Sequence, residues 1–219
     1  MLTDLLSLEK NFSKNTAVTF EDVNKKPVHI HYDEFLRSST DLQQDLFRLV
    51  RPSSQNDQRI SIGVSCKVTA QLPICVYSII QSGYVLVPLS VKPFDRFISA
   101  LERTGTRFVL LTQDDHHSLS SENNLNSTLL SATTKIHQLE SLPMYRLLEV
   151  TEGTSPIRRY RDSIMYIIQS SGTTGDPKLI YVTAGSINSN ILDLRYCLLV
   201  TINFALFLAL FFIRFSEKE

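Results

Sequence analysis

The middle of the chain alternates short apolar runs with longer segments whose apolar residues recur at helical spacing. The apolar runs span 59–65, 84–89 and 107–111, and the helical segments span 69–82 and 94–104. Each helical segment stops at a glycine, Gly83 or Gly105, which is typical of a helix end. Strands and helices that alternate at short spacing predict a parallel sheet with crossover helices, the doubly wound α/β class.

The flanking segments predict further elements, although with less regular patterns. Helices are expected over 2–13 and 33–50, and strands over 16–20, 28–32, 145–150, 163–169 and 179–183. The stretch from Gln113 to Glu140 is rich in Ser, Asn, Thr and His. We interpret that stretch as a loop or a weakly helical insertion, because it offers few groups that drive burial.

Composition narrows the class of protein. A chain of 219 residues with 43% apolar and 20% charged residues can form one sizeable globular domain. The 22 basic and 22 acidic residues balance, which argues against a nucleic-acid partner. Three scattered cysteines suit a reducing compartment, and the start of the chain lacks the features of a secretory signal. A cytoplasmic location is therefore expected for residues 1–195.

Two polar clusters have both a functional and a structural interpretation. Asp114, Asp115, His116 and His117 suggest a metal site, but the absence of spaced partner ligands favours a solvated turn, so no metal site is predicted. The basic cluster at 158–161 is interpreted as a solvated approach loop, with phosphate steering as the alternative.

The most diagnostic segment is the loop 170–178, which lies between two predicted strands. Phosphate recognition by a loop needs glycines that aim backbone N–H groups at the anion, hydroxyl donors and a cationic side chain. The loop supplies all three, through Ser170, Ser171, Gly172, Thr173, Thr174, Gly175 and Lys178. The segment predicts a site for the phosphates of ATP.

Its spacing differs from G-x-x-x-x-G-K-[ST], so the loop is not a nucleoside-triphosphatase P-loop. An ordinary turn is the alternative, since Ser, Gly and Thr runs often form turns. The strands on both sides and the ending Pro177-Lys178 favour the phosphate site.

The segment Tyr166–Lys178 resembles the hallmark of the adenylate-forming superfamily of AMP-dependent synthetases and ligases, which includes the acyl-CoA synthetases and peptide-synthetase adenylation domains. Residues 17–20 and 31–35 are similar to the family's opening hairpin and first helix. The stretch from Ile62-Gly63-Val64 through Ile79–Leu89 is similar to its Gly- and Pro-containing segment. The resemblance covers about 1–195, and the opening residues are similar to the beta-alanine-activating (acyl-CoA synthetase family member 4) type.

The resemblance implies a two-step reaction with ATP and Mg²⁺. A carboxylate, such as that of a fatty acid or an amino acid, attacks the α-phosphate of ATP to give an acyl-adenylate and pyrophosphate. Coenzyme A or a pantetheine arm then accepts the acyl group. By position, residues 170–178 would hold the β- and γ-phosphates, and no residue of this chain is assigned a catalytic role.

The sequence also departs from the family pattern. Leu179 stands where the family usually has glycine, and Ala184-Gly185 where it usually has histidine. Past residue 195 the chain contains no adenine-binding Gly-Tyr-Gly-x-Thr-Glu segment, no ribose-binding aspartate segment and no C-terminal catalytic lysine. We therefore expect 1–195 to be a partial AMP-binding domain that is inactive alone. The alternative is a non-catalytic, membrane-tethered isoform that acts as a binding protein.

The segment 196–213 has eighteen residues without an ionised side chain, between Arg195 and Arg214, and a short polar end follows at 214–219. That length suits a transmembrane helix, which would attach the protein to a membrane. We favour a second interpretation, in which the segment is a splice-derived or translated-intron tail of a truncated isoform. A third interpretation is a buried apolar helix.

Overall fold

The computed structural model describes residues 13–21, 26–50, 58–121, 134–150, 159–161, 163–170 and 178–190. The chain divides into two compact units, residues 1–181 and 182–219. In chain order the elements are β1 (Thr16–Phe20), β2 (Val28–His31), α2 (Tyr32–Val50), β3 (Gln58–Ser65), α3 (Leu72–Gln81), β4 (Val85–Leu89), α4 (Phe94–Thr104), β5 (Phe108–Thr112), α5 (Gln113–Ser121), β6 (Thr134–Gln138), β7 (Tyr145–Val150), β8 (Arg159–Arg161), β9 (Ile164–Gln169) and β10 (Leu179–Thr183).

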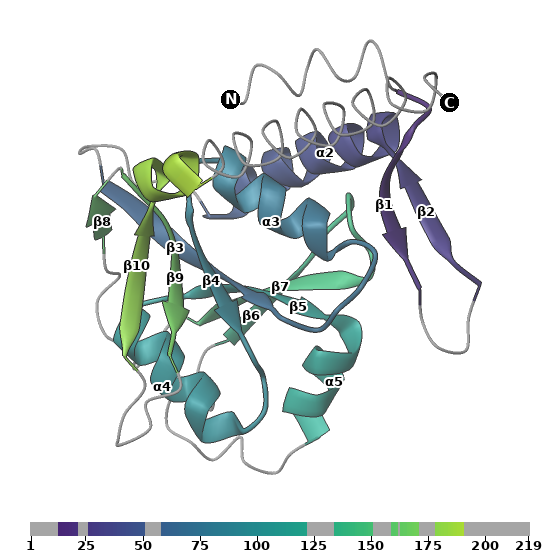
Figure 1. Ribbon diagram of the computed structural model, residues 1–219. Coiled ribbons are helices and arrows are strands. Elements are labelled where there is room, and N and C mark those ends of the chain that lie inside the picture. Colours follow the sequence, from purple (N-terminus) through teal and green to yellow (C-terminus); the bar gives the residue numbers. More distant parts are fainter. Residues whose placement is uncertain are drawn as a thin grey trace, which may run out of the picture. The chain divides into compact units, whose positions relative to one another are not determined.

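A mostly parallel sheet organises the first unit (Figure 1). Its strand order is β10-β9-β4-β3-β5-β7-β6, and β8 pairs with the start of β3. β3 runs parallel to β4 and β5, and β9 runs parallel to β4. β7 pairs antiparallel with β5, and β6 with β7. The parallel centre confirms the predicted α/β class, and the antiparallel strands make the sheet mixed.

Helices cover both faces of the sheet, because apolar side chains of the strands point alternately to each side. On one face Leu86 and Leu110 join a core with residues of α2 and α3. On the other face Val87 and Val109 pack with Phe97 of α4 and with α5. The continuous apolar runs seen in the sequence therefore belong to strands that are buried on both sides.

Helix ends follow the glycines that the sequence indicated. Gly105 caps α4 in the left-handed conformation at φ 60°, and Gly83 lies just beyond α3 at φ 78°. Residues with a Cβ rarely adopt these angles, so glycine at both positions lets the chain turn directly into the next strand.

Two segments differ from their predictions. The expected loop or insertion between Gln113 and Glu140 contains α5 and β6, in addition to residues outside the described range. The predicted solvated approach loop at 158–161 contains β8, where Tyr160 is buried and donates a hydrogen bond of 2.6 Å to the carbonyl oxygen of Thr104. β8 pairs with the distant strand β3, and β6 pairs with the next strand, β7, so in both cases strand pairing stabilises a segment whose local sequence is polar.

The predicted helix at 2–13 and the apolar segment at 196–213 lie outside the described residues, apart from Ser13. Among the helices that the structure describes, none combines the length and the apolar character that crossing a membrane requires.

Close packing at Gly63 in β3 gives a test of the fold. A Cβ at this position would lie 2.5 Å from Cδ1 of Leu89 and 3.2 Å from both methyl carbons of Val109. Both neighbours are buried, so we expect Gly63→Val to lower the free energy of unfolding by about 1–3 kcal/mol through overpacking.

Gly185→Ala is the matched control, measured by urea denaturation beside the Gly63 variant. A Cβ at Gly185 meets only Thr183 Oγ1 at 3.8 Å, so its effect should stay within about 1 kcal/mol. Equal stability of Gly63→Val and the unsubstituted chain would contradict the packing described for β3.

Candidate functional site

The predicted phosphate loop joins two neighbouring strands of the sheet, β9 and β10. The arrows of these strands run in opposite directions, so the loop forms the turn of a hairpin (Figure 1). Of the predicted site residues, Ser170 and Lys178 are described, and they lie at the two ends of the loop. Ser171, Gly172, Thr173, Thr174 and Gly175 lie outside the described residues, and their phosphate contacts stay a prediction.

The ends of the loop are joined by hydrogen bonds. The backbone N–H of Ser170 donates to the carbonyl oxygen of Lys178 over 2.9 Å, and the Ser170 hydroxyl donates to the same oxygen over 3.4 Å. Ile167, fully buried in β9, fixes the strand that enters the loop. The Lys178 side chain is exposed, so its ammonium group is accessible to an anion.

Parallel pairing places the carboxyl ends of four strands at one edge of the sheet. The segment 66–67 follows β3, the segment 90–92 follows β4, α5 follows β5, and the predicted phosphate loop follows β9. In open α/β sheets, ligands bind in the crevice outside this edge. The phosphate loop therefore lies where the fold class places ligands.

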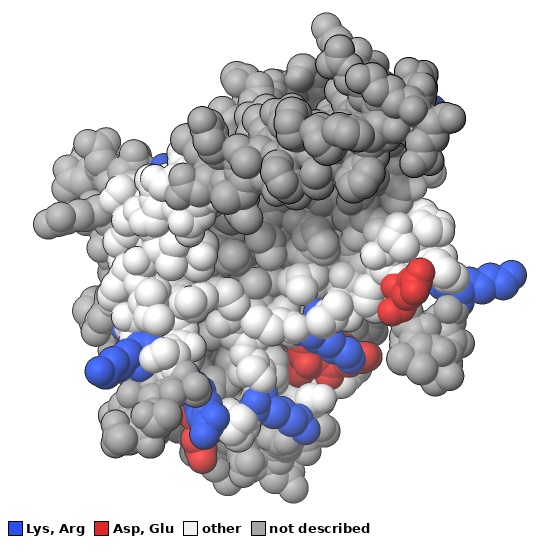
Figure 2. All heavy atoms as spheres, in the orientation of Figure 1, with Lys and Arg blue, Asp and Glu red and all other residues white. Residues whose placement is uncertain are grey.

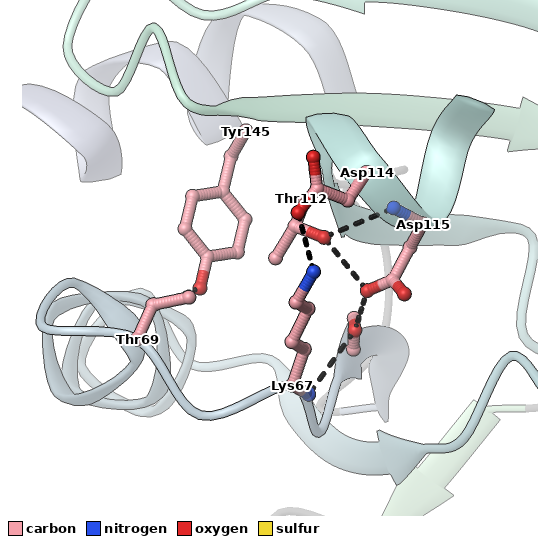
Figure 3. A network of polar contacts seen from close by, with 7 residues as sticks. Lys67, Thr69, Thr112, Asp114, Asp115 and Tyr145 are labelled. Atoms are coloured by element: carbon pink, nitrogen blue, oxygen red, sulfur yellow. Dashed lines mark hydrogen bonds and ion pairs between the residues drawn. The ribbon is translucent and has the colours of Figure 1, made fainter. Parts of the chain in front are cut away.

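A polar network joins the carboxyl ends of β3 and β5 (Figure 3). Asp115 accepts hydrogen bonds from the hydroxyl of Ser65 and, over 2.8 Å, from that of Thr112. The backbone N–H of Asp115 returns a bond of 3.1 Å to the Thr112 hydroxyl. Asp115 thereby fixes the first turn of α5 against both strands.

Lys67 extends across the same edge (Figure 3). Its ammonium group forms an ion pair with Asp114, and its backbone N–H donates to the Ser65 hydroxyl over 3.3 Å. The hydrogen bond to Asp114 raises the pKa of Lys67 above its usual range. Because 45% of the Lys67 side chain is exposed, this pair is accessible to solvent and to solutes.

Other side chains near this edge have shifted ionisation. Burial raises the pKa of the Cys66 thiol and of Tyr145, whose hydroxyl lies 2.7 Å from that of Thr69. Burial also lowers the pKa of His116, with smaller contributions from His117 and Arg146. In the described part of the chain, no group of three or more His, Cys, Asp or Glu side chains has the arrangement that holds a metal ion.

The sequence interpretation missed this network. It assigned Asp114 and Asp115 to a solvated turn, whereas the structure places them in the first turn of α5, in contact with residues some fifty positions earlier. The available signal was positional: Ser65 ends one buried strand and Lys67 lies two residues beyond it, and the two aspartates lie within three residues of the end of another.

The sequence matches the family of AMP-binding enzymes over residues 14–214, and the chain belongs to this family. The matched range includes 196–213, and the domain boundary expected at residue 195 stays a prediction. Among curated relatives, a nonribosomal peptide synthetase of Aspergillus flavus is 24% identical over 161 residues, which cover 73% of this chain and 2% of that protein. A beta-alanine-activating enzyme of Danio rerio is 26% identical over 189 residues, covering 82% of this chain and 16% of that protein.

Solved structures show the same fold. O-succinylbenzoate coenzyme A synthetase of Bacillus subtilis, in complex with AMP, has a TM-score of 0.55 at 18% identity and covers 83% of this chain. A fatty acyl-adenylate ligase of L. pneumophila, in complex with acyl adenylate and pyrophosphate, has a TM-score of 0.57 at 16% identity and covers 86%. This chain spans 42% and 31% of the lengths of those chains.

The two neighbouring aspartates provide a matched test of the network. Asp115→Ala removes the acceptor of two buried hydroxyl groups, so we expect a loss of about 1–3 kcal/mol in the free energy of unfolding. Asp114→Ala removes an ion pair whose acidic side chain is 75% exposed, and should cost at most about 1 kcal/mol. Chemical denaturation of both variants measures the difference, and equal losses would contradict the structural role of Asp115.

Proposed function

We propose that this chain forms the ATP-phosphate-holding part of an adenylate-forming ligase. The observation that carries the proposal is the hairpin between β9 and β10, whose loop 170–178 combines glycines, hydroxyls and a lysine at the carboxyl edge of the parallel sheet. The two ends of the loop are joined by the hydrogen bond from the backbone N–H of Ser170 to the carbonyl oxygen of Lys178. The family match and the fold of the solved relatives agree with this role.

The reaction of the complete protein would join a carboxylic acid to AMP. A carboxylate oxygen forms a bond to the α-phosphorus of ATP, and the bond from that phosphorus to the β-phosphate oxygen breaks as pyrophosphate leaves. Negative charge grows on the pyrophosphate, and backbone N–H groups, hydroxyls and the Lys178 ammonium would stabilise it. The loop would also fix the triphosphate for in-line attack.

In this proposal, Mg²⁺ would bind together with the nucleotide. It is bound in such sites mainly through substrate phosphates and water, with one or two carboxylates. The described residues at the loop ends, Ser170 and Lys178, include no carboxylate, so no residue of this chain is assigned to the metal.

The acid and the thiol belong to the proposal for the complete protein. The relatives are named for beta-alanine activation, peptide synthesis and fatty acyl-adenylate formation, so an amino acid or a fatty acid is the proposed class of substrate. Coenzyme A or a pantetheine arm is the proposed acceptor. Adenylation also requires groups that hold adenine, ribose and the acid, so we expect the 219 residues alone to bind phosphates without turnover.

Pyrophosphate binding tests the role of the loop. Isothermal titration of the full chain should show binding that Lys178→Ala weakens about tenfold or more, because the variant loses a charged hydrogen-bond donor. Lys14→Ala is the matched control, since Lys14 is an exposed lysine paired with Asp33 on a different part of the chain. Equal weakening in both variants would contradict a site at 170–178.

ATP–pyrophosphate exchange tests whether the chain is active alone. Across a panel of fatty acids and amino acids, we expect no carboxylate-dependent exchange above the background of the Lys178→Ala variant. Exchange that depends on both a carboxylate and Lys178 would overturn the proposal that this chain binds without turnover, and would leave the phosphate site supported.

A further inference from the structure

The two strands that flank the phosphate loop differ in how firmly they are packed. β9 enters the loop with Ile167 fully buried, and it pairs with β4. β10 is an edge strand of the sheet, where Leu179 is half-buried and the side chains of Ile180 and Tyr181 are 44% and 45% exposed. Lys178 directly precedes β10, so its position depends on how this edge strand is held.

The hairpin strands carry no charge that could hold them. Neither β9 nor β10 contains Asp, Glu, Lys or Arg, so side chains of these strands form no ion pair with the rest of the sheet. In the space-filling view the surface over β9 and β10 is mostly uncharged, and charged side chains gather lower on this face (Figure 2). The attachment of β10 therefore depends on strand pairing and on contacts of uncharged side chains.

One such contact joins β10 to β8. The ring of Tyr181 lies against the ring of Tyr160, with the centroids 6.0 Å apart and the planes at 43°. Tilted aromatic pairs at this spacing are favourable beyond the area that they bury. Leu179 packs on the core beside α4, and side chains two residues apart in a strand point to the same face. Tyr181 therefore continues the attachment of β10 on the same face as Leu179.

Tyr160 is itself firmly held. It is 7% exposed and belongs to the core beside α4, and β8 pairs with the start of β3. Its hydroxyl donates a hydrogen bond of 2.6 Å to the carbonyl oxygen of Thr104, at the end of α4. Thr104 is fully buried, and its own hydroxyl donates to the carbonyl oxygen of Ala100 over 2.7 Å. The Tyr160 ring is thus fixed through both its strand and its hydroxyl.

We propose that Tyr160 is a positioning residue for the phosphate loop: its ring holds Tyr181, which fixes β10 and the Lys178 that precedes it. The inference rests on the proposed function, since it concerns the phosphate-binding role of Lys178. Tyr181 lies about 10 Å from Lys178 along an extended strand, so its effect on an anion is indirect. A loop whose ends are already fixed loses less conformational entropy when it binds, and this gain in preorganisation should appear as affinity.

Three substitutions on β10 test the contact by isothermal titration of the full chain with pyrophosphate. Tyr181→Leu removes the ring at an exposed position and should weaken binding about two- to tenfold. Tyr181→Phe keeps the ring and should retain the affinity. Ile180→Leu is the matched control, because it places the same residue on the same strand, at a side chain that points to the opposite face. It should also leave the affinity unchanged.

A double-mutant cycle tests whether Tyr160 is the partner through which Tyr181 acts. In a Tyr160→Leu background, Tyr181→Leu should weaken pyrophosphate binding no further, because the contact is already lost. Tyr160→Phe is the second variant, for use if Tyr160→Leu does not fold. It keeps the ring but loses the hydrogen bond to Thr104, so it should weaken binding less than Tyr181→Leu does. Independent, additive losses from the two tyrosines would contradict the proposed coupling.

Hydrogen exchange of the unliganded chain tests the positioning separately from phosphate binding. The amide of Ser170 donates to the carbonyl oxygen of Lys178, so its exchange reports whether the two ends of the loop separate. In Tyr181→Leu this amide should exchange about two- to tenfold faster, while the amides of β3 keep their rates. Ile180→Leu should change neither, and a general loss of stability would accelerate both.

The outcomes separate this inference from the proposed function. Binding that Lys178→Ala weakens but Tyr181→Leu does not would overturn the positioning role and leave the proposed function supported. No pyrophosphate binding by the unsubstituted chain would overturn the proposed function and, with it, any role of the tyrosines in that binding. Equal exchange of the Ser170 amide in Tyr181→Leu and the unsubstituted chain would show that the two rings do not fix the hairpin, whatever the binding result.

Discussion

The parallel pairing of β3 with β4 and β5, and of β4 with β9, is the constraint on which the rest of the molecule depends. It brings four strand ends to one edge of the sheet, although the first and last of these ends, Ser65 and Gln169, are far apart in the sequence. It also requires helices on both faces, because every crossover must pass over the sheet. The two apolar cores and the polar edge are consequences of the same pairing.

Tight packing at the centre of the sheet fixes this arrangement. Gly63 allows Leu89 and Val109, from the two flanking strands, to approach β3 more closely than any side chain would permit. On the same strand, the Ser61 hydroxyl lies 2.8 Å from that of Thr106 in a buried network, toward the opposite end of β3 from Ser65. Hydrophobic contact holds the middle of β3, and polar contacts fix its ends.

Much of this fold could be predicted from the sequence because its signals are local. The helix Phe94–Thr104 and the strands Tyr145–Val150 and Leu179–Thr183 match their predictions at both ends, since apolar periodicity and a terminal glycine or loop define them. β6 and β8 could not be found in this way. Tyr160 of β8 lies between two arginines in the sequence. It is buried because β8 pairs with β3 and because its hydroxyl donates a hydrogen bond to the carbonyl oxygen of Thr104.

The polar side chains at the carboxyl edge of the sheet show the same limit of prediction from local sequence. A phosphate loop is contiguous, so its glycines, hydroxyls and lysine are visible in nine successive residues. The polar network assembles Ser65, Lys67, Thr112 and Asp115 from two strand ends, and no short window of the sequence contains them. Knowledge of strand order is needed before these residues can be grouped.

Ser170 illustrates how geometry refines a role that composition suggests. Its hydroxyl was predicted as one of several phosphate donors, yet in the structure it donates to the carbonyl oxygen of Lys178, as does its backbone N–H. A hydroxyl engaged in this way holds the two ends of the loop together. Closing the hairpin at its base limits the conformations of the residues between, which lowers the entropy that an anion must overcome when it orders the loop. In the proposed function, Ser170 would therefore contribute to phosphate binding by positioning the two ends of the loop, and direct contact with the anion would fall to other residues of 170–178, Lys178 among them.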